Sequence, residues 1–372
     1  MKIKSLRLQD FRNFENFEVQ FADRLNLFIG QNGQGKSNLL EALSLLILNE
    51  SFRYADNENL IQFHKPGSFI EALLEKNSLD FKAKLQILKS RKNLTWNEKK
   101  ITLSTLRENI SCVVFSPESL TSVKDGSDER RILVDQAVSA THFSGAALIS
   151  DFRKALKTRN RILKDFSEGQ ADKKTTLALL ESLDPIYLRL SIELTMARIE
   201  LLRGLQPDLQ EAMQFIVKEP VDISVEYSIS RIKSSNLTAD QVHDAIHQRL
   251  LELRDAELGF GSSLVGPHKH EITFFYNQKD SRFYCSQGQQ RAMILSFKMA
   301  QIVYHRKVHG TYPILLLDDV LSELDIAKRN SLIEFLHGIK TQIFLTTTDL
   351  QFTKDVNISE SKIFELKEGR IL

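Results

Sequence analysis

A glycine-rich stretch near the start of the chain, Gly30–Ser37 (GQNGQGKS), restricts the possible folds more than any other part of the sequence. It matches the phosphate-loop pattern G-x-x-x-x-G-K-[ST] at every fixed position. The apolar run Leu25–Ile29 before it predicts a strand, and residues 38–46 after it predict a helix. This order is the context that the pattern requires, so the sequence predicts an α/β nucleotide-binding fold. A chance glycine-rich turn is the alternative, and the flanking strand and helix argue against it.

The residues of this loop suit a triphosphate and its metal ion. Glycines allow backbone N–H groups to turn towards phosphate oxygens, and the N-terminus of the following helix also attracts anions. Lys36 would place a positive charge at the β- and γ-phosphates, and the Ser37 hydroxyl would bind Mg²⁺. The predicted nucleotide-binding residues here are Gly30, Gln31, Asn32, Gly33, Gln34, Gly35, Lys36, Ser37 and Asn38.

A second stretch, ILLLDDVLSELD, lies far downstream at residues 314–325. Its four apolar residues place Asp318 at the carboxyl end of a buried strand, where a carboxylate would hold Mg²⁺ through water. Asp319 follows in the position of a base that polarises the attacking water. Strands often end in a solvated carboxylate, so the pattern is weak alone. Beside a complete phosphate loop, it indicates a nucleoside triphosphatase.

A third stretch, CSQGQQR at residues 285–291, opens another predicted helix of about residues 289–303. Ser286 and Gly288 at a helix N-terminus form a second anion-binding corner. One nucleotide does not need two such corners from the same chain, but a head-to-tail dimer would use both. Lys36, Asp318, Asp319 and Ser286 are therefore the predicted catalytic residues, with an ordinary capped helix as the alternative interpretation of Ser286.

Composition indicates a soluble globular protein. Of the 372 residues, 42% are hydrophobic and 26% are charged, which argues against global disorder. The formal net charge is +2, so a nucleic-acid surface would have to come from local clustering of charge. The two cysteines, the absence of a signal peptide and the absence of a long apolar run predict a cytoplasmic protein without a membrane span.

The predicted elements divide the chain into two parts. Strands are predicted at residues 3–8, 16–29, 112–115, 272–276, 314–317 and 342–345, short strands within 69–103, and a helix at about 326–338. Between them, residues 127–258 show mainly helical spacing with one strand near 221–229. The predicted domains are therefore a nucleotide fold of residues 1–126 and 259–372, and a mainly helical insert of residues 127–258.

The three stretches, in this order, resemble the phosphate-binding loop, signature motif and acidic strand of ABC-type ATPase heads of the SMC class. Within that class the chain resembles the RecF family nearly end to end, through IKSLRLQDFRNF, SFRYADNENLIQF, VVFSPESL, DERRILVDQ, KTRNRILK and GPHKHEITF. The resemblance implies an ABC-type ATPase head with a helical inserted domain, like a short-armed SMC head.

The resemblance also implies roles for individual residues. Arg53 would sense or clamp the phosphates of ATP. Ser286, Gly288 and Gln289 would meet the nucleotide held by the opposite protomer, and Asp325 would lie at the dimer seam. Asp319 takes the place where many ABC heads have a catalytic glutamate.

Three departures from the family pattern are visible. The usual Q-loop glutamine has no clear counterpart, and Ser116 or Glu118 occupies its neighbourhood. The histidine after the last core strand is absent, since TTTD stands at residues 346–349, and this implies slow hydrolysis. Lys269 and His270 follow GPH where an arginine and an acid are usual, which leaves the role of this loop open.

By this resemblance, ATP and Mg²⁺ would join two protomers into a homodimer that closes on double-stranded or gapped DNA. RecR and RecO would work with it to help RecA replace single-strand-binding protein. Another DNA-associated SMC-class ATPase outside this pathway is the alternative. A transporter subunit is disfavoured by the 248 residues between Ser37 and Ser286, and a long-armed SMC protein by the lack of sustained heptads. A nuclease-linked ATPase would need a further metal-binding domain.

Weaker patterns concern DNA and metals. Arg153, Lys157, Arg161 and Lys164 fall on one face of a predicted helix, and such a basic stripe would follow a DNA backbone. A solvated helix face is the alternative. The pairs His243/His247 and His268/His270 have no third ligand nearby and are interpreted as solvated or structural residues rather than zinc ligands.

Overall fold

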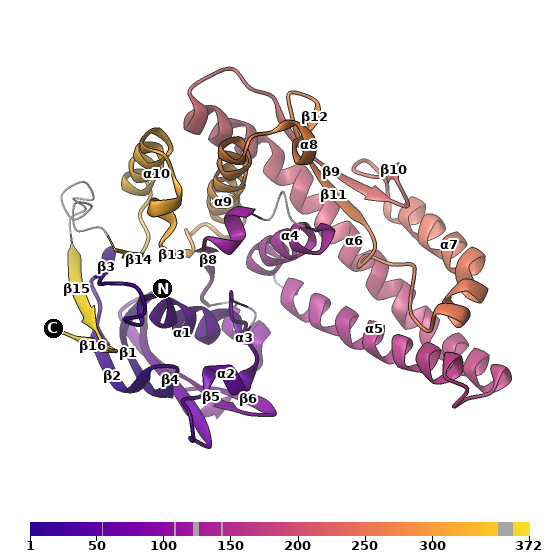
Figure 1. Cartoon of the computed structure of the whole chain (residues 1–372), viewed down its shortest axis with the longest axis horizontal. Coiled ribbons are helices and arrows are strands. Elements are labelled where there is room, and N and C mark those ends of the chain that lie inside the picture. The colour runs from indigo at the N-terminus through magenta and orange to yellow at the C-terminus, as the bar shows by residue number, and fades with distance from the viewer. Residues whose placement is uncertain (54, 108, 122–125, 143, 349–359) are drawn as a thin grey trace. The chain divides into compact units, whose positions relative to one another are not determined.

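The computed structural model describes residues 1–372 except 54, 108, 122–125, 143 and 349–359, and also omits the side chains of residues 103, 104, 118 and 121. The chain forms two compact units. Unit 1 comprises Met1–Thr121, Gln214–Glu219 and Arg291–Leu372, and unit 2 comprises Ser122–Met213 and Pro220–Gln290. Figure 1 shows the elements of both units along the chain.

A six-stranded, mainly parallel sheet forms the first layer of unit 1. Its strands, in spatial order, are β16 (Arg370–Ile371), β15 (Ser361–Lys367), β3 (Leu25–Ile29), β14 (Ile343–Thr347), β13 (Ile314–Asp318) and β8 (Cys112–Phe115). All neighbours are parallel except β15 and β16. Every residue of β3, β14, β13 and β8 is buried, which explains their continuous apolar runs.

An antiparallel sheet forms the second layer of unit 1. Its order is β2 (Phe14–Gln20), β1 (Lys2–Phe11), β4 (Gly67–Lys76), β5 (Leu79–Leu88), β6 (Arg91–Trp96) and β7 (Lys99–Lys100). Helix α1 (Lys36–Leu48) packs against β13 and β8 on one side and β4 and β5 on the other. Because both faces of α1 are covered, nearly all of its residues are buried, and its apolar residues do not form a single stripe.

The remaining elements of unit 1 are short except for two helices. They are α2 (Asn57–Leu60), α3 (Leu103–Arg107), η1 (Glu118–Thr121), η2 (Val320–Glu323), α10 (Ile326–Gly338), and α9 (Gln287–His309) from Arg291 onward.

Unit 2 is mainly helical. Its helices are α4 (Ser127–Thr141), α5 (Gly145–Ser167), most of α6 (Lys173–Val217), α7 (Ala239–Phe260) and α8 (Ser281–Tyr284). A small antiparallel sheet has the order β10 (Ile232–Lys233), β9 (Ile223–Ile229), β11 (Glu271–Tyr276) and β12 (Lys279–Asp280). Buried ion pairs join its elements: Arg159 lies 2.7 Å from Glu257, and Arg198 lies 2.8 Å from Asp135.

The predicted fold class is confirmed, and several predicted elements agree closely with the structure. Residues 112–115 form β8, residues 326–338 form α10, and β9 covers most of the strand predicted near 221–229. The single strand predicted at 16–29 was wrong, because residues 21–24 separate β2 from β3. The division into residues 1–126 with 259–372 and residues 127–258 stays a prediction.

Two features were not predicted. Helix α6 is 45 residues long and continues through Pro185 and Pro207, although proline usually ends or kinks a helix. Strands β15 and β16 near the C-terminus were missed, since β15 is largely exposed and lacks a continuous apolar run. In the described part of the chain, no helix has the length and apolar character that crossing a membrane requires.

Candidate nucleotide site

The loop between β3 and α1 leaves little room for a side chain at Gly30 or Gly35. Gly35 has a φ of 107°, and a Cβ there would lie 2.7 Å from Asn13 Nδ2. A Cβ on Gly30 would lie 2.5 Å from the carbonyl oxygen of Leu366. Gly35 is also the residue directly before α1, so the loop leads into a helix N-terminus. The backbone here is therefore placed as a phosphate-binding loop requires.

Lys36 lies folded against the inside of this loop. Its side chain is buried, and Nζ donates to the carbonyl oxygens of Gly30 at 2.5 Å and Gln31 at 2.8 Å. Burial lowers the pKa of Lys36, while the charges of Asp319 and Asp318 act in the opposite direction. A buried ammonium that faces two carboxylates is suited to an anionic ligand that replaces its carbonyl partners.

The sheet brings the acidic strand to the same edge as the phosphate loop. Strand β14 pairs with β3 on one side and β13 on the other, all in parallel. The carboxyl ends of β3 and β13 therefore lie one strand apart, where ligands of open α/β sheets bind. Asp318, the last residue of β13, is 5% exposed and accepts a hydrogen bond of 2.8 Å from Thr346 Oγ1.

Asp319 has an unusual conformation for a residue with a side chain. Its φ is 47° and its ψ is 26°, in the left-handed region, and its N–H donates to Thr346 Oγ1 at 2.9 Å. The Oδ1 atom is buried and has no hydrogen-bond partner in the described structure. Burial raises the pKa of Asp319, and Lys36 partly offsets this effect. A constrained carboxylate with an open acceptor fits a group that orients water.

The residues around the loop fit Mg²⁺ by their chemistry. Ser37 Oγ and the Asp318 carboxylate are hard oxygen donors, which Mg²⁺ prefers, and it usually keeps several waters as further ligands. Ser37 and Asp318 would hold the ion, and the ion would supply charge neutralisation at the β- and γ-phosphates.

Arg53 lies beside the start of α1. Its Nη1 donates to Asn38 Oδ1 at 3.1 Å, and Asn38 Nδ2 donates to Asn13 Oδ1 at 2.7 Å. These bonds connect the predicted phosphate sensor to the residue directly after Ser37.

A positioning group next to Arg53 was missed by the sequence reasoning. Glu41 is fully buried, and Arg12 donates to both of its oxygens, at 2.9 Å and 2.8 Å. Ser51 Oγ donates to Glu41 Oε1 at 2.5 Å and accepts from the N–H of Arg53. Arg12 belongs to the IKSLRLQDFRNF stretch, but nothing in the sequence shows that it pairs with Glu41, which lies 29 residues further along the chain. Thr346 was missed for the same reason.

Serine and threonine stand at or beside two of the three departures from the family pattern. Ser116 follows β8, is buried, and its N–H donates to Ser119 Oγ at 3.1 Å. The side chain of Glu118 and all of Asp349 lie outside the described residues. Thr346 and Thr347 end β14, and Thr346 bonds to Asp318 as described above.

The corner at Ser286 belongs to unit 2. Ser286 is exposed directly before α9, its Oγ accepts from Gln289 N at 3.3 Å, and its N–H donates to Gln289 Oε1 at 2.9 Å. This reciprocal pair is a capping box. Gly288 lies in the first turn of α9, and Asp325 caps α10 through the N–H of Lys328 at 3.0 Å. The role of these residues towards a second protomer stays a prediction.

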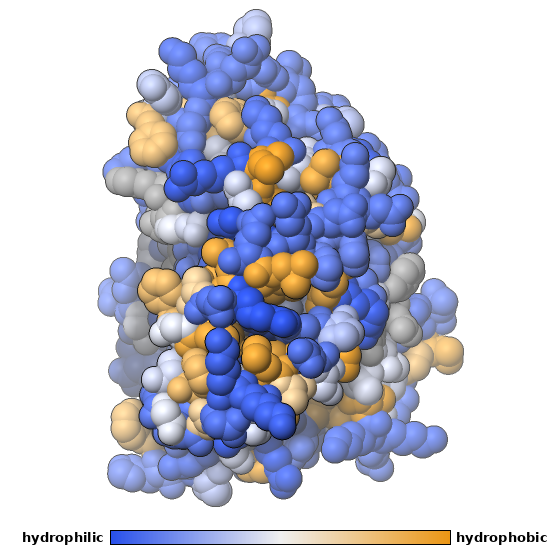
Figure 2. All heavy atoms as spheres, turned by 90° about the vertical axis from the view of Figure 1, so that its right-hand side faces the viewer, coloured by the Kyte–Doolittle hydropathy of each residue, from blue (hydrophilic) through white to orange (hydrophobic). Residues whose placement is uncertain are grey.

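The basic stripe lies on α5 as expected from its spacing. Arg153, Lys157, Arg161 and Lys164 are exposed, whereas Arg159 of the same run is buried in its ion pairs. Arg161 and Lys164 lie 3.9 Å and 3.5 Å from Asp165 and Glu168. Figure 2 shows a largely hydrophilic surface on the side where α5, α6 and α7 end, with hydrophobic side chains in small separate groups. DNA contact by the stripe stays a prediction.

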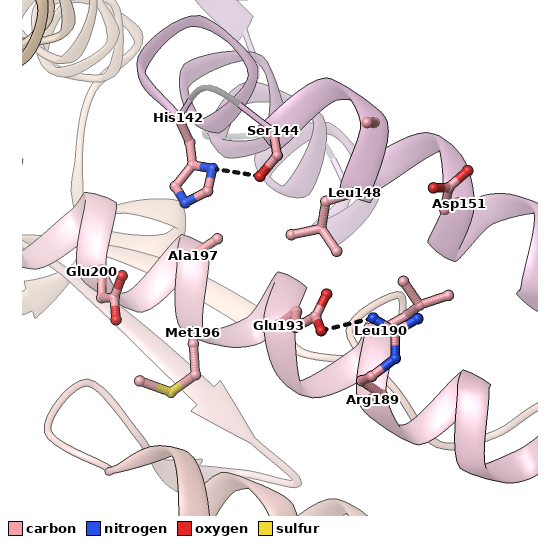
Figure 3. Close-up of a pocket in the computed structure, with 11 residues that line it drawn as sticks. His142, Ser144, Leu148, Asp151, Arg189, Leu190, Glu193, Met196, Ala197 and Glu200 are labelled. Atoms are coloured by element: carbon pink, nitrogen blue, oxygen red, sulfur yellow. Dashed lines mark hydrogen bonds and ion pairs between the residues drawn. The ribbon is translucent and has the colours of Figure 1, made fainter. Parts of the chain in front are cut away.

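A separate groove of about 460 Å³ lies in unit 2. Figure 3 shows Leu148 of α5 facing Leu190 and Ala197 of α6 across it. Its lining also includes three carboxylates, Asp151, Glu193 and Glu200. Carboxylates repel a triphosphate, so the groove does not compete with the Lys36 loop as the nucleotide site.

His268 and His270 of the GPHKH stretch make hydrogen bonds to other groups of unit 2. His270 Nδ1 lies 2.8 Å from the hydroxyl of Tyr227, and His268 Nε2 lies 3.0 Å from the carbonyl oxygen of Ser263. Burial lowers the pKa of His268 to about 4 and also lowers that of His270. Among the residues that the structure describes, no three His, Cys, Asp or Glu side chains gather as metal ligands.

Comparison with known proteins decides the family. The RecF/RecN/SMC N terminal domain family matches residues 2–370. The DNA replication and repair protein RecF of Lactobacillus johnsonii is 33% identical over 376 residues, covering 100% of this chain and 99% of the relative. RecF of Geobacter sp. (strain M21) is also 33% identical, with complete coverage of both chains. The chain belongs to the RecF family.

Solved structures agree with this membership. The recombination mediator protein RecF-ATPrS in the RecFOR pathway has a TM-score of 0.84, 27% identity, and coverage of 99% of this chain and 97% of its own. The Smc head domain of Pyrococcus furiosus, with a TM-score of 0.53 and 13% identity, shares the fold alone. This RecF-family chain thus has an SMC-like ABC ATPase head, as the resemblance implied.

Proposed function

We propose that this chain is an ATP-dependent DNA-binding protein of recombinational repair and replication. ATP would bind at Gly30–Asn38 with Lys36 on its phosphates and Arg53 nearby, and Mg²⁺ would bind at Ser37 and Asp318. Asp319 would orient the attacking water. The ATP-bound RecF structure of similar fold, at 26% identity and a TM-score of 0.84, supports the choice of nucleotide.

We further propose that ATP joins two copies of the chain. The Ser286, Gly288 and Gln289 corner of each copy would close on the nucleotide at Lys36 of the other, with Asp325 at the seam. Nucleotide and dimer would stabilise each other, since each binds more tightly when the other is present. Hydrolysis would be slow, because no histidine follows β14, and it would reopen the dimer.

The proposed dimer would act on DNA near single-strand gaps in the cytoplasm. Residues 1–126 and 259–372 would form the ATPase head, with residues 127–258 as the inserted arm. RecR and RecO are the proposed partners, by the RecFOR context of the similar solved structures, and together they would help to load RecA.

The single observation that carries the proposal is the unpartnered Oδ1 of Asp319, in a strained backbone, at the sheet edge that also holds Lys36. Such strain and an open buried acceptor are costly unless a ligand uses them.

The direct test measures binding to a gapped duplex by fluorescence anisotropy, with ATP and Mg²⁺ and with ADP. Wild-type protein should bind more tightly with ATP, and Lys36→Ala should bind equally weakly with both nucleotides. Equal affinity of the wild-type protein for DNA with ATP and with ADP would refute the proposal. Normal ATP-dependent binding to DNA without any effect of RecR or RecO would instead favour an SMC-class ATPase outside this pathway.

The stripe on α5 has its own test. Reversing charge with Lys157→Glu and Arg161→Glu should weaken DNA binding and reduce its salt dependence, because each phosphate contact contributes to the salt slope. Unchanged affinity and salt slope would remove the stripe from the proposed DNA surface.

A further inference from the structure

The strands β5–β7 and their turns carry an excess of positive charge that the sequence reasoning did not identify. Residues 79–100 contain seven Lys or Arg and two Asp or Glu. The whole chain contains 50 basic and 48 acidic residues, which leaves 43 basic and 46 acidic residues elsewhere. This short segment is therefore strongly positive, while the rest of the chain is slightly negative.

Strand register places four of these cations on one face of the antiparallel sheet. Ala83, Leu85 and Ile87 of β5 point into the core, so Lys82 and Lys84 point outward. Lys84 pairs with Thr95 of β6, which pairs with Lys100 of β7, and Leu88 pairs with Arg91. Lys82, Lys84, Arg91 and Lys100 are called the β5–β7 surface below, and Figure 1 shows the strands β5 and β6 that carry most of it.

The cations of this surface differ in how firmly they are held. Lys82 lies 3.0 Å from Glu71, and Lys84 Nζ lies 4.6 Å from the centre of the Phe69 ring. Arg91 and Lys100 are exposed and have no ion-pair partner among the described residues. Both charges are therefore available to an anion from solution.

The neutral side chains of this face are also suited to phosphate. Gln86 and Asn93 lie on it, 3.1 Å apart, together with Thr95. Amide and hydroxyl groups supply many of the contacts that proteins make to the nucleic-acid backbone. The structure describes all of residues 79–100. Of the two acids in this segment, Asp80 is at the start of β5 and Glu98 is in the turn before β7.

Protection of a sheet edge is the competing explanation, since lysines on edge strands prevent sheets from pairing. It suits Lys100 on the edge strand β7. It does not account for Lys82 and Lys84, because β5 is covered by β4 and β6 on both sides.

We propose that the β5–β7 surface binds the phosphate backbone of duplex DNA, as a contact separate from the α5 stripe. The assignment to DNA rests on the proposed function, whereas the location rests on charge and register. Lys82 and Lys84 are alternate residues of β5, about 7 Å apart, and Lys100 lies two strands from Lys84, about 10 Å away. Arg91 lies opposite Leu88, about 14 Å along the strands from Lys84, so the four cations can face phosphates over several nucleotides of one duplex.

The test compares two variants with equal loss of charge. Arg91→Gln with Lys100→Gln removes the two unpaired cations of the surface. Lys99→Gln with Lys340→Gln is the control, because Lys99 pairs with Trp96 on the opposite face of β7 and Lys340 is exposed outside the antiparallel sheet. Binding to duplex DNA is measured with ATP over a series of salt concentrations, and dimer formation with ATP is measured without DNA.

The first variant should bind DNA about ten-fold more weakly, and its salt slope should fall by about 1.8, at about 0.9 for each phosphate contact. The control should keep most of the wild-type affinity, and both should dimerise normally. Equal binding by both variants, whether unchanged or equally weakened, would overturn the β5–β7 surface alone. Displacement of the DNA by polyglutamate at equal charge would overturn the assignment to a phosphate backbone. Wild-type protein that dimerises but binds no DNA would overturn the proposed function as well.

Discussion

The phosphate loop of unit 1 and the serine corner of unit 2 are both glycine-containing helix N-termini, yet they are built differently. The loop contains a buried ammonium, Lys36 Nζ, that donates to two of the loop's own carbonyl groups. The corner has no cation of its own within Ser286–Gln290, and its exposed serine is occupied by a capping box with Gln289. The loop can therefore attract a triphosphate alone, whereas the corner offers weaker, neutral donors.

This difference explains why one site would be permanent and the other conditional. A charged, preorganised loop binds before any partner arrives. A neutral corner contributes only when another element has already positioned the phosphate, which is what a latch between two protomers needs. Substitutions in the two regions should therefore have separable effects.

Lys36→Ala should have the largest effect. Removing a buried cation from its phosphate contacts costs about 4 kcal/mol, so ATP affinity should fall about 1000-fold. Isothermal titration with ATP and Mg²⁺ measures this loss, with the exposed Lys340→Ala as the control. Near-normal ATP affinity in Lys36→Ala would show that the loop is not the primary site.

Ser286→Arg should leave the first site intact and affect the second. ATP affinity of the monomer should be unchanged, while the dimer should be weakened by about 3 kcal/mol, or about 100-fold, because a bulky charge would enter the protomer seam. Sedimentation across a concentration series measures the dimer. Ser167→Arg, at the exposed end of α5, is the control. If the Ser286→Arg monomer lost ATP binding, the phosphate loop and the serine corner would belong to one site within a single chain. That result would contradict the difference proposed between the two regions.

Asp319→Asn should mainly affect turnover. Loss of a general base lowers rates by about 100-fold or more, whereas the shape of the side chain is retained. Steady-state phosphate release measures turnover, and the ATP-bound dimer of this variant should persist longer than that of the wild type. Unchanged turnover would assign the water-orienting role to another residue.

The smallest effect concerns stability and pH. Burial raises the pKa of Asp319, so the protonated form stabilises the folded chain, and this contribution is lost as pH rises through the raised pKa. At neutral pH, Asp319→Asn should therefore have a free energy of unfolding equal to or above that of the wild type. The difference should narrow as pH falls through the raised pKa. Urea unfolding at several pH values measures it, and a difference that does not change with pH would contradict the assignment.

The parts of the fold that were predicted correctly are those with a local signal. The phosphate loop, β8, β13 and α10 each show their periodicity or pattern within a few residues. The loop and the two aspartates were predicted as one site because an acidic strand end is a strong pattern beside a complete phosphate loop. In the structure, parallel strands bring their carboxyl ends to one edge.

What the sequence did not reveal depends on contacts between distant residues. Arg12 meets Glu41 only in the folded chain, and Thr346 of β14 meets Asp318 of the neighbouring strand β13. The β5–β7 surface needs strand register to bring Lys84 and Lys100 to one face. Helix α6 overrode the tendency of Pro185 and Pro207 to end it, because packing along its length outweighs local preference.

We propose that the phosphate loop of one protomer is completed by the serine corner of another, and light scattering on a sizing column measures whether two protomers join. With ATP and Mg²⁺, the wild-type mass should rise from 42.7 kDa to twice that value, and it should stay at 42.7 kDa with ADP. Ser286→Arg, although it binds ATP, should stay at the lower mass under both conditions. A wild-type protein that remains monomeric with ATP, or a Ser286→Arg protein that dimerises normally, would contradict the claim.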